Sequence, residues 1–242
     1  MASQIKLFNQ DCMSAMKQMP DKAFDLAIVD PPYGIGNFVM ISGTNKVNRR
    51  NYKKELEWNE ETPTDQYFKE LRRVSEKQIV WGANYYNCFT TGGALVWWKN
   101  IGHPNMSQCE IAACSFQKKV DYVHIPWASG FYRGLFGPTI HPCQKPVDLY
   151  AWCLNKYAKD GDKILDTHLG SGSIAIACYD MGFDLCGYEI DESYFKAAVE
   201  RLERHKKQFT LFDGDSRHEG VGRLQCGKDG KDTGDYQDDS LF

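Results

Sequence analysis

One tetrapeptide, Asp30-Pro31-Pro32-Tyr33, gathers residue types that could do chemistry. It follows the apolar run Phe24–Val29, which predicts a buried parallel strand. The tetrapeptide therefore lies at a strand's carboxyl end, where open α/β sheets place active sites. The prolines remove backbone donors, so nearby carbonyl groups are expected to point outward unpaired. Together a carboxylate, a carbonyl group and an aromatic face suit a planar ring with an exocyclic amine; a packing turn with a solvated Asp30 is the alternative.

A second candidate site follows the predicted strand Lys163–Asp166. The segment Asp166–Ser173 leads into a predicted helix, and its glycines permit a tight turn and close approach of a ligand to the backbone. Glu189 ends the next predicted strand, where a carboxylate accepts hydrogen bonds from a ribose diol. Because the acid of this loop disfavours a pyrophosphate, the loop suits a cationic or zwitterionic ligand. A plain turn with a surface Glu189 is the alternative.

In this order along the chain, the two segments resemble the amino-group DNA methyltransferases of the permuted beta arrangement, in which Asp-Pro-Pro-Tyr precedes the cofactor loop. Further stretches that resemble segments of this family are Gln10–Cys12, Ile79–Tyr85, Trp97–Asn100 and His141–Pro146. The similarity covers residues 5–212 and is closest in style to phage and restriction-modification enzymes. One departure is Thr167-His168, where family members usually carry Pro-Phe.

The resemblance implies S-adenosylmethionine as the cofactor and no metal. The residues that it implies around the cofactor are Asp11, Cys12, Asp30, Lys145, Pro146, Asp166, His168, Gly170, Ser171, Gly172, Ser173 and Glu189. Within this set, Asp11 would reach the adenine amine, and Lys145 with Pro146 would help to build the methionine end. His168 would form a flat wall over the cofactor in place of the family's Phe, or simply fill space.

The implied reaction is direct transfer of a methyl group from the sulfonium to the exocyclic amine of a base flipped out of double-stranded DNA. The catalytic residues would be Asp30, Pro31, Pro32 and Tyr33. The Asp30 carboxylate and the Pro31 carbonyl would accept hydrogen bonds from the two N–H groups of the amine and stabilise the positive charge that develops on its nitrogen. Tyr33 would stack on the base.

Asp at position 30 favours adenine N6 as the target, because Ser is more typical of the cytosine enzymes of this family. Cytosine N4 on the same fold is the first alternative. An RNA or protein-amide substrate is the second, and a catalytically silent DNA-binding subunit of a heteromeric methylase is the third. Pro142-Cys143 resembles the nucleophilic Pro-Cys of cytosine-C5 enzymes, but it precedes the cofactor loop, so a structural cysteine is predicted.

Candidate DNA contacts fall in two segments. Residues 34–62 form a polar loop that we expect to be mobile near the active site. Its basic side chains would either contact DNA phosphates or be merely solvated, and they are Lys46, Arg49, Arg50, Lys53 and Lys54. Residues 117–140 are the expected target-recognition insert, with Lys118, Lys119 and Arg133 as readers. Because this insert is short, specificity could need a homodimer. Gln208–Phe212 resembles a sliding-clamp peptide, although a final packed strand is favoured.

The elements that must position these sites alternate between strand and helix, which predicts a doubly wound Rossmann-like α/β fold, mostly parallel with an antiparallel edge. Predicted strands are Ile5–Phe8, Phe24–Val29, Gln78–Trp81, Ala94–Trp98, Glu110–Phe116, Val120–Ile125, Lys163–Asp166 and Asp184–Glu189, the fifth and sixth as a hairpin. Predicted helices are Ser14–Met19, one from Pro63 capped by Thr62, one from Pro146, Ser173–Met181 and Ser193–His205.

Composition and charge suit one methyltransferase domain over residues 1–212 with a disordered acidic tail over 213–242. The tail holds eight acids and four bases, so residues 1–212 carry +1 while the whole chain carries −3. Nine cysteines without a Cys-x-x-Cys pair, no secretion signal and no apolar run of membrane-spanning length predict a cytoplasmic protein with reduced thiols. The six histidines lack zinc-ligand spacing.

Overall fold

The computed structural model describes residues 3–35, 60–86, 88–100, 107–127, 140–141 and 143–212, with the backbone alone for 209–212. The chain divides into two units, Met1–Lys206 and Lys207–Phe242. Every described strand belongs to the first unit. Most of the predicted loop 34–62, part of the predicted insert 117–140 and the predicted tail 213–242 lie outside the described residues.

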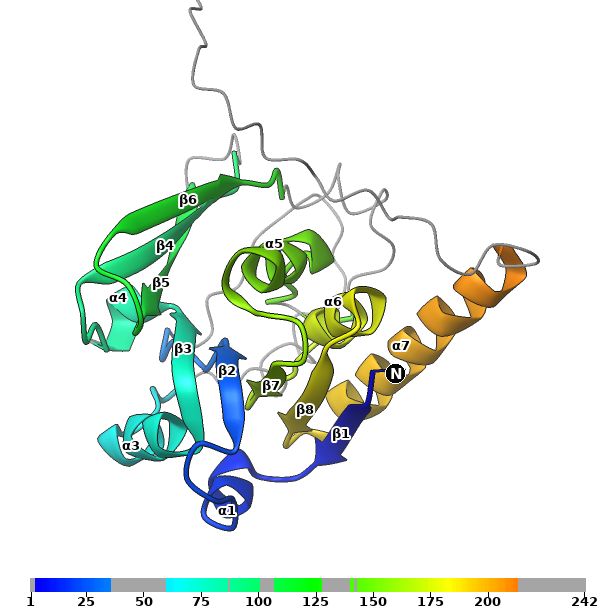
Figure 1. The fold of residues 1–242 in the computed structure, drawn as a ribbon, viewed down its shortest axis with the longest axis horizontal. Coiled ribbons are helices and arrows are strands. Elements are labelled where there is room, and N and C mark those ends of the chain that lie inside the picture. Colours follow the sequence, from blue (N-terminus) through cyan, green and yellow to red (C-terminus); the bar gives the residue numbers. More distant parts are fainter. Residues whose placement is uncertain are drawn as a thin grey trace, which may run out of the picture. The chain divides into compact units, whose positions relative to one another are not determined.

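An eight-stranded sheet orders the first unit as β1-β8-β7-β2-β3-β5-β4-β6 (Figure 1). Its strands are β1 (Ile5–Asn9), β2 (Phe24–Val29), β3 (Ser75–Trp81), β4 (Gly93–Trp98), β5 (Cys109–Cys114), β6 (Val120–His124), β7 (Lys163–Asp166) and β8 (Asp184–Glu189). Neighbours run parallel except around β5, which is antiparallel to β3 and β4. The predicted α/β class and mostly parallel sheet are confirmed, but the antiparallel strand lies inside the sheet and not at its edge.

The hairpin predicted from the fifth and sixth strands is wrong, because β5 and β6 both pair with β4. The buried end of β5, Ala112–Cys114, needs partner strands on both sides and finds them in β3 and β4. In contrast, β6 alternates exposed and half-buried residues, which suits an edge strand. The connection between them crosses Gly93, where an added Cβ atom would lie 2.0 Å from the Gln117 carbonyl oxygen.

Helices cover both faces of the sheet (Figure 1). They are α1 (Cys12–Met16), α3 (Asp65–Val74), α4 (Ala83–Tyr86), α5 (Val147–Tyr157), α6 (Ser173–Met181) and α7 (Glu192–Phe212). Along β2, Leu26 and Ile28 pack in the core with α5, α6 and α7, whereas Ala27 and Val29 pack with α1 and α3. This alternation is what a strand buried on both faces requires.

Several predicted boundaries shift for local reasons. The first helix begins at Cys12, because the Asp11 carboxylate accepts hydrogen bonds from the N–H groups of Met13 and Ser14. The helix predicted from Pro63 begins at Asp65, with Thr64 and not Thr62 at the N-cap position. The short helix α4 was not predicted.

The last predicted helix is longer than expected. Its end moves from His205 to Phe212, so a packed strand over Gln208–Phe212 is wrong. No Gly or Pro follows Ser193 before Gly214, so no residue breaks the helix earlier. Of the residues expected on its inner side, Ala198 and Leu202 are buried but Phe195 is only half-buried.

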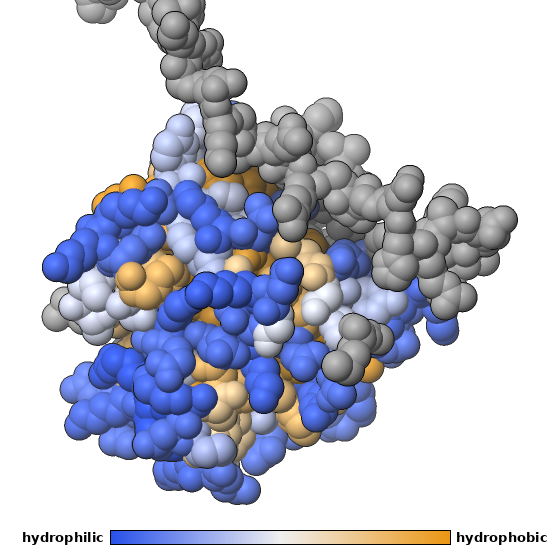
Figure 2. Space-filling view, viewed as in Figure 1, coloured by the Kyte–Doolittle hydropathy of each residue, from blue (hydrophilic) through white to orange (hydrophobic). Residues whose placement is uncertain are grey.

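The outer surface over α1 and α3 is mostly hydrophilic (Figure 2). The amphipathic pattern of α3 explains this, because Tyr67, Phe68, Leu71 and Val74 are buried as predicted and the charged residues face outward. Among the described residues, no helix combines the length and the apolar character needed to cross a membrane.

Candidate active site

The turn after β2 and the loop after β7 line one pocket of about 340 Å³. These strands are parallel neighbours, and β8 follows on the other side of β7. Their carboxyl ends therefore meet at one edge of the sheet, as the switch-point rule expects. The predicted site residues that line this pocket are Asp30, Pro31, Pro32, Tyr33, Lys145, His168, Gly170, Ser171 and Glu189.

Six predicted cofactor residues do not line the pocket: Asp11, Cys12, Pro146, Asp166, Gly172 and Ser173. The Asp11 carboxylate instead caps α1, where it accepts from the Ser14 N–H at 2.8 Å and the Ser14 hydroxyl at 2.7 Å. Cys12 begins that helix, and burial raises the pKa of its thiol to about 12. Pro146 is the N-cap of α5.

The backbone of the loop after β7 depends on glycine. Gly170 and Gly172 have φ angles of 51° and 70°, in the left-handed region. A Cβ atom at Gly172 would also lie 3.1 Å from the Ala198 Cβ atom of α7. The Glu189 carboxylate accepts from the Gly170 N–H at 2.8 Å and from the Asp191 N–H at 3.0 Å, which orients it at the end of β8.

Arg201 of α7 holds this loop through two hydrogen bonds. Its Nη1 donates to the Ser171 carbonyl oxygen at 2.9 Å and to the Ser173 Oγ at 2.8 Å. The Ser173 hydroxyl in turn donates to the Lys145 carbonyl oxygen at 2.7 Å. Burial lowers the pKa of Arg201 to about 10. Sequence reasoning missed Arg201, because its partners are 28 and 30 residues away in the chain.

Asp30 lies in a network of buried charges. Its Oδ1 accepts from the Tyr33 hydroxyl at 2.6 Å, and its Oδ2 is paired with the Lys145 ammonium. Burial raises the pKa of Asp30, while Lys145 acts in the opposite direction. Lys145 also lies 3.2 Å from Glu110 of β5, and Lys99 lies 3.0 Å from the other oxygen of Glu110. Lys145 was expected at the methionine end, but its ammonium group reaches Asp30 and Tyr33 of the turn after β2.

The helix α4 supports the Asp30–Tyr33 turn. Tyr85 stacks on the Tyr33 ring, with centroids 4.8 Å apart and planes inclined by 15°. The Tyr86 hydroxyl donates to the Pro31 carbonyl oxygen. The prediction of an unpaired carbonyl is therefore wrong in this state, because α4 supplies a donor from outside the turn.

Asp166 is buried beside the pocket, and its Oδ1 accepts from the His168 N–H at 3.0 Å. Burial raises the pKa of Asp166 to about 8, and the nearby Asp30 and Glu189 add to the shift. Burial lowers the pKa of His168 to about 4, so this pocket-lining ring is neutral near pH 7. This half of the pocket therefore holds no histidine cation near pH 7, and a bound cation would favour the ionised form of Asp166.

The pocket has further lining residues that were not predicted: His141, Cys143, Tyr150, Leu169, Ile190, Asp191 and Tyr194. Burial raises the pKa of the Cys143 thiol to about 11, which does not suit a nucleophile. Ile190 and Asp191 directly follow Glu189, so their chain position was a usable signal. Glu110 also had one, because it is a lone charge in the otherwise apolar strand Cys109–Cys114.

The two predicted DNA-contacting residues that the structure describes, Lys118 and Lys119, are not brought to the pocket. Lys118 and Lys119 immediately precede β6, which is parallel to β4, so they lie at the amino edge of the sheet and the pocket lies at the carboxyl edge. Lys119 also forms an ion pair with Asp121 at 3.4 Å. The other predicted bases, Lys46, Arg49, Arg50, Lys53, Lys54 and Arg133, lie outside the described residues.

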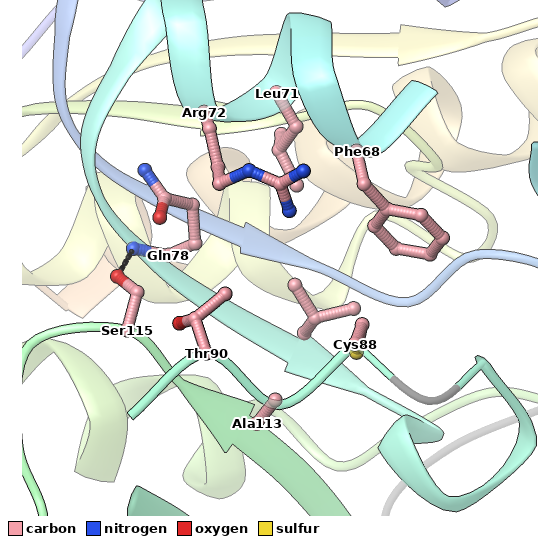
Figure 3. Close-up of a pocket in the computed structure, with 9 residues that line it drawn as sticks. Phe68, Leu71, Arg72, Gln78, Cys88, Thr90, Ala113 and Ser115 are labelled. Carbon is pink, nitrogen blue, oxygen red and sulfur yellow. Dashed lines mark hydrogen bonds between the residues drawn. The ribbon is translucent and has the colours of Figure 1, made fainter. Parts of the chain in front are cut away.

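A second hollow lies between α3 and the strands β3 and β5 (Figure 3). Phe68 and Arg72 of α3 face it from one side and Ala113 from the other. Beside it the Gln78 N–H donates to the Ser115 hydroxyl oxygen at 2.9 Å. Its volume of about 20 Å³ suits a water molecule and not a nucleoside.

Comparisons with known proteins agree with this geometry. Residues 96–200 match the model of a DNA methylase family, the N6/N4 methyltransferases. The type II methyltransferase M.HpaI of Haemophilus parainfluenzae is 22% identical over an alignment of 249 positions, gaps included. This alignment covers 86% of this chain and 77% of that protein. The solved M1.HpyAVI–SAM complex has a TM-score of 0.54 at 19% identity, covering 82% of this chain and 100% of that one.

The PvuII DNA methyltransferase, described as cytosine-N4-specific, also has a TM-score of 0.54, at 12% identity over 86% of this chain and 92% of that one. At such identities the solved structures show the fold alone. The family match and the curated relative confirm the resemblance to the amino-group DNA methyltransferases. The fold and the site are therefore consistent with the N6/N4 DNA methylases, the family whose model residues 96–200 match. The matched region contains Lys145, Gly170 and Glu189, while Asp30 joins them through the shared pocket.

Proposed function

We propose that this chain transfers a methyl group from S-adenosylmethionine to the exocyclic N6 of adenine in a base flipped out of DNA. One observation carries the proposal. The Asp30–Tyr33 turn lines the same pocket of about 340 Å³ as Gly170 and Glu189. A group suited to an exocyclic amine and a loop suited to a nucleoside cofactor therefore face each other, as direct transfer between two bound ligands requires.

The pocket fits a cationic nucleoside. Glu189, Asp191 and the buried Asp166 lie at or beside it, whereas its two histidines are neutral near pH 7, because burial lowers the pKa of His141 and of His168 to about 4. Glu189 would accept hydrogen bonds from the ribose diol, and the glycine loop would admit the ligand close to the backbone. S-adenosylmethionine, when bound, supplies an electrophilic methyl group on a positive sulfur.

The residues of the chain supply the acceptor side. An exocyclic amine is a poor nucleophile because its lone pair is delocalised into the ring. Asp30 would accept one N–H bond and stabilise the positive charge that develops on the nitrogen. The Pro31 carbonyl oxygen already accepts from the Tyr86 hydroxyl, and its second lone pair would accept a hydrogen bond from the other N–H of the amine. The Tyr33 ring, held by Tyr85 on one side, would stack on the base.

Adenine is preferred over cytosine on the type of residue at position 30. Cytosine N4 is the second candidate, and the specific observation that favours it is the fold similarity to a methyltransferase described as cytosine-N4-specific. Both reactions use the same acceptor geometry, so the mechanism of the chain's own residues is unchanged. Methylation of RNA or of a protein amide ranks below both, as does a catalytically silent DNA-binding subunit, because neither is favoured by a specific feature of the pocket.

The first experiment is expression in a bacterial strain that lacks DNA methylation, followed by hydrolysis of its DNA and mass spectrometry of the nucleosides. N6-methyladenine supports the proposal. N4-methylcytosine retains the mechanism and changes the base. Absence of both from DNA of the expressing cells contradicts DNA methylation by this chain alone.

Three further expectations stay predictions: a homodimer, a cytoplasmic location, and binding of the sliding clamp through Gln208–Phe212. The backbone of that segment is helical. Sedimentation tests the first and cell fractionation the second. A pull-down with purified clamp tests the third, and no retention of the wild-type chain contradicts it.

A further inference from the structure

Four side chains of alternating charge form a row at the acceptor side of the pocket: Lys99, Glu110, Lys145 and Asp30, here named the charge row. Lys99 Nζ lies 3.0 Å from Glu110 Oε1, and Lys145 Nζ lies 3.2 Å from Glu110 Oε2. Lys145 is also paired with Asp30. One ammonium group is thus shared between two carboxylates, one following β2 and the other on β5.

The charge row is buried and electrically balanced. The exposed fractions of the side chains are 4% for Lys145, 9% for Lys99, 13% for Asp30 and 22% for Glu110. Two positive and two negative groups sum to zero. Such a set is stable while it remains complete, because removal of one member leaves a charge out of water without a partner.

The ion pair between Lys145 and Asp30 opposes the proposed chemistry. Asp30 must stabilise positive charge on the target amine, yet an ammonium group in contact with Asp30 cancels most of its field. Simple departure of Lys145 would leave it unpaired in a buried site, which is costly. Lys145 therefore needs a second acceptor within reach, and Glu110 is that acceptor.

We propose that Glu110 is a positioning residue of the catalytic centre, which holds Lys145 when the target amine takes its place on Asp30. This inference rests on the proposed function. The Tyr33 hydroxyl lies 2.6 Å from Asp30 Oδ1 and 3.3 Å from Glu110 Oε2, so it bridges the two carboxylates between which the ammonium group would move. Lys99 keeps Glu110 charged in both states.

The titration of Glu110 is consistent with this role. Burial by itself raises the pKa of a carboxyl group, but Lys145 and Lys99 lower that of Glu110 to about 2. Other titratable groups that face the charge row come from every neighbouring element: Tyr33 of the catalytic turn, Tyr86 of α4, His141 and Cys143 of the preceding segment, Tyr150 of α5 and Asp166 of β7. None of these is a cation near pH 7, so Lys99 and Lys145 supply the positive charge among these groups.

The test is the pH dependence of kcat for methyl transfer to unmethylated bacterial DNA in two variants. In Glu110→Gln, Lys145 pairs with Asp30 alone, which lowers the pKa of Asp30. The acid limb of the pH profile of kcat therefore moves to lower pH, and the plateau value of kcat falls about ten-fold. In Lys99→Met, Glu110 has lost one of its two positive partners, so Glu110 draws Lys145 away from Asp30. The acid limb then moves to higher pH by about one unit. A fault of packing would not produce shifts of opposite sign.

Binding of S-adenosylmethionine, measured by calorimetry, shows that each variant is folded. Glu203→Gln is the matched control, because it removes an exposed ion pair with Lys206 and should not shift the acid limb of the pH profile. If Glu110→Gln does not fold, the double variant Lys99→Met/Glu110→Gln keeps the charges balanced. Its acid limb must then lie at a lower pH than that of Lys99→Met alone. Unshifted limbs, or shifts of the same sign, overturn the inference. A wild-type chain that does not methylate DNA overturns the proposed function instead.

Discussion

At the scale of single residues, Asp166 determines how the pocket responds to charge. It is buried and lies near two other acids, so its pKa is raised from an ordinary 3.8 to about 8, although the hydrogen bond that it accepts from the His168 N–H acts in the opposite direction. Without a ligand it is therefore mostly protonated at pH 7. A cation in the pocket favours the ionised form, which couples ligand binding to release of a proton.

The expected consequence is that binding of S-adenosylmethionine becomes tighter as pH rises toward about 8 and levels off above it. The sign follows because only the ionised carboxylate attracts the sulfonium, and the carboxylate forms as pH rises. Isothermal titration calorimetry across this range measures it. S-adenosylhomocysteine, which is a neutral thioether, is the control and should lack this dependence. Asp166→Asn should flatten the pH dependence, and an unchanged slope in that variant contradicts the assignment.

In the proposed mechanism, Asp30 is the residue on which methyl transfer depends. Replacement of Asp30 by Asn keeps the shape but removes the negative charge that stabilises the methylated nitrogen. We expect kcat to fall by about 10²- to 10³-fold. Cofactor and DNA affinity, measured by calorimetry and fluorescence anisotropy, should change little. Full activity in a folded Asp30→Asn chain would show that the proposed mechanism is wrong.

At the scale of elements, α4 and the glycine before it position the acceptor side of the site. Gly82 has a φ of 75°, and a Cβ atom there would lie 2.3 Å from Cε1 of Tyr33. Tyr85 stacks on the same ring, and Tyr86 reaches the Pro31 carbonyl. The Tyr33 ring is thus held in place before any base arrives, which lowers the entropy cost of stacking.

Gly82→Ala should displace the Tyr33 ring and reduce kcat. Gly92→Ala is a matched control, because Gly92 has a φ of 77° but nothing within 4 Å of an added Cβ atom. Both variants lose about 1 kcal/mol of stability from backbone strain. Only Gly82→Ala should also lose activity in a methyl-transfer assay. Equal activities of the two variants would rule out positioning of Tyr33 by this contact.

The helix α7 acts on the cofactor side through Arg201. Arg201→Met removes the two hydrogen bonds that Arg201 donates to the loop after β7. Because each bond to a charged donor is worth about 1.5–3 kcal/mol, we expect cofactor binding to weaken at least ten-fold, with little change in kcat at saturation. Arg204→Met on the exposed side of α7 is the control. Unaltered affinity in Arg201→Met would show that the loop holds its shape without this residue.

At the scale of the whole molecule, charge is distributed unevenly along the chain. Residues 213–242 carry a net −4, and residues 1–212 carry +1. DNA is strongly negative, so the acidic segment opposes association at long range. A chain that ends at residue 212 should bind duplex DNA more tightly at low salt, and the difference should disappear at high salt. Fluorescence anisotropy at several salt concentrations measures this, and equal affinity of the two chains at low salt contradicts it.

Much of the fold and site could be predicted from local sequence. The strands Phe24–Val29, Lys163–Asp166 and Asp184–Glu189 and the helix Ser173–Met181 have the predicted bounds. Each is a short segment bounded by Gly, Pro or charged turn residues, so the signals that define it are local. The two functional turns were found for the same reason, because each immediately follows such a strand.

Only the tertiary structure decided which distant side chains complete the site. Lys145 pairs with Asp30 and Glu110, and Glu110 also pairs with Lys99. Glu110 lies beside Lys145 because β5 inserts between β3 and β4, and a strand pairing of this kind leaves no local mark on the sequence. Tyr86 reaches the Pro31 carbonyl across 55 residues because β3, which leads into α4, is the parallel neighbour of β2. Local propensity therefore determined where each turn begins, whereas burial and long-range pairing determined what surrounds it, because the free energy of burying a charge depends on partners far away in the chain.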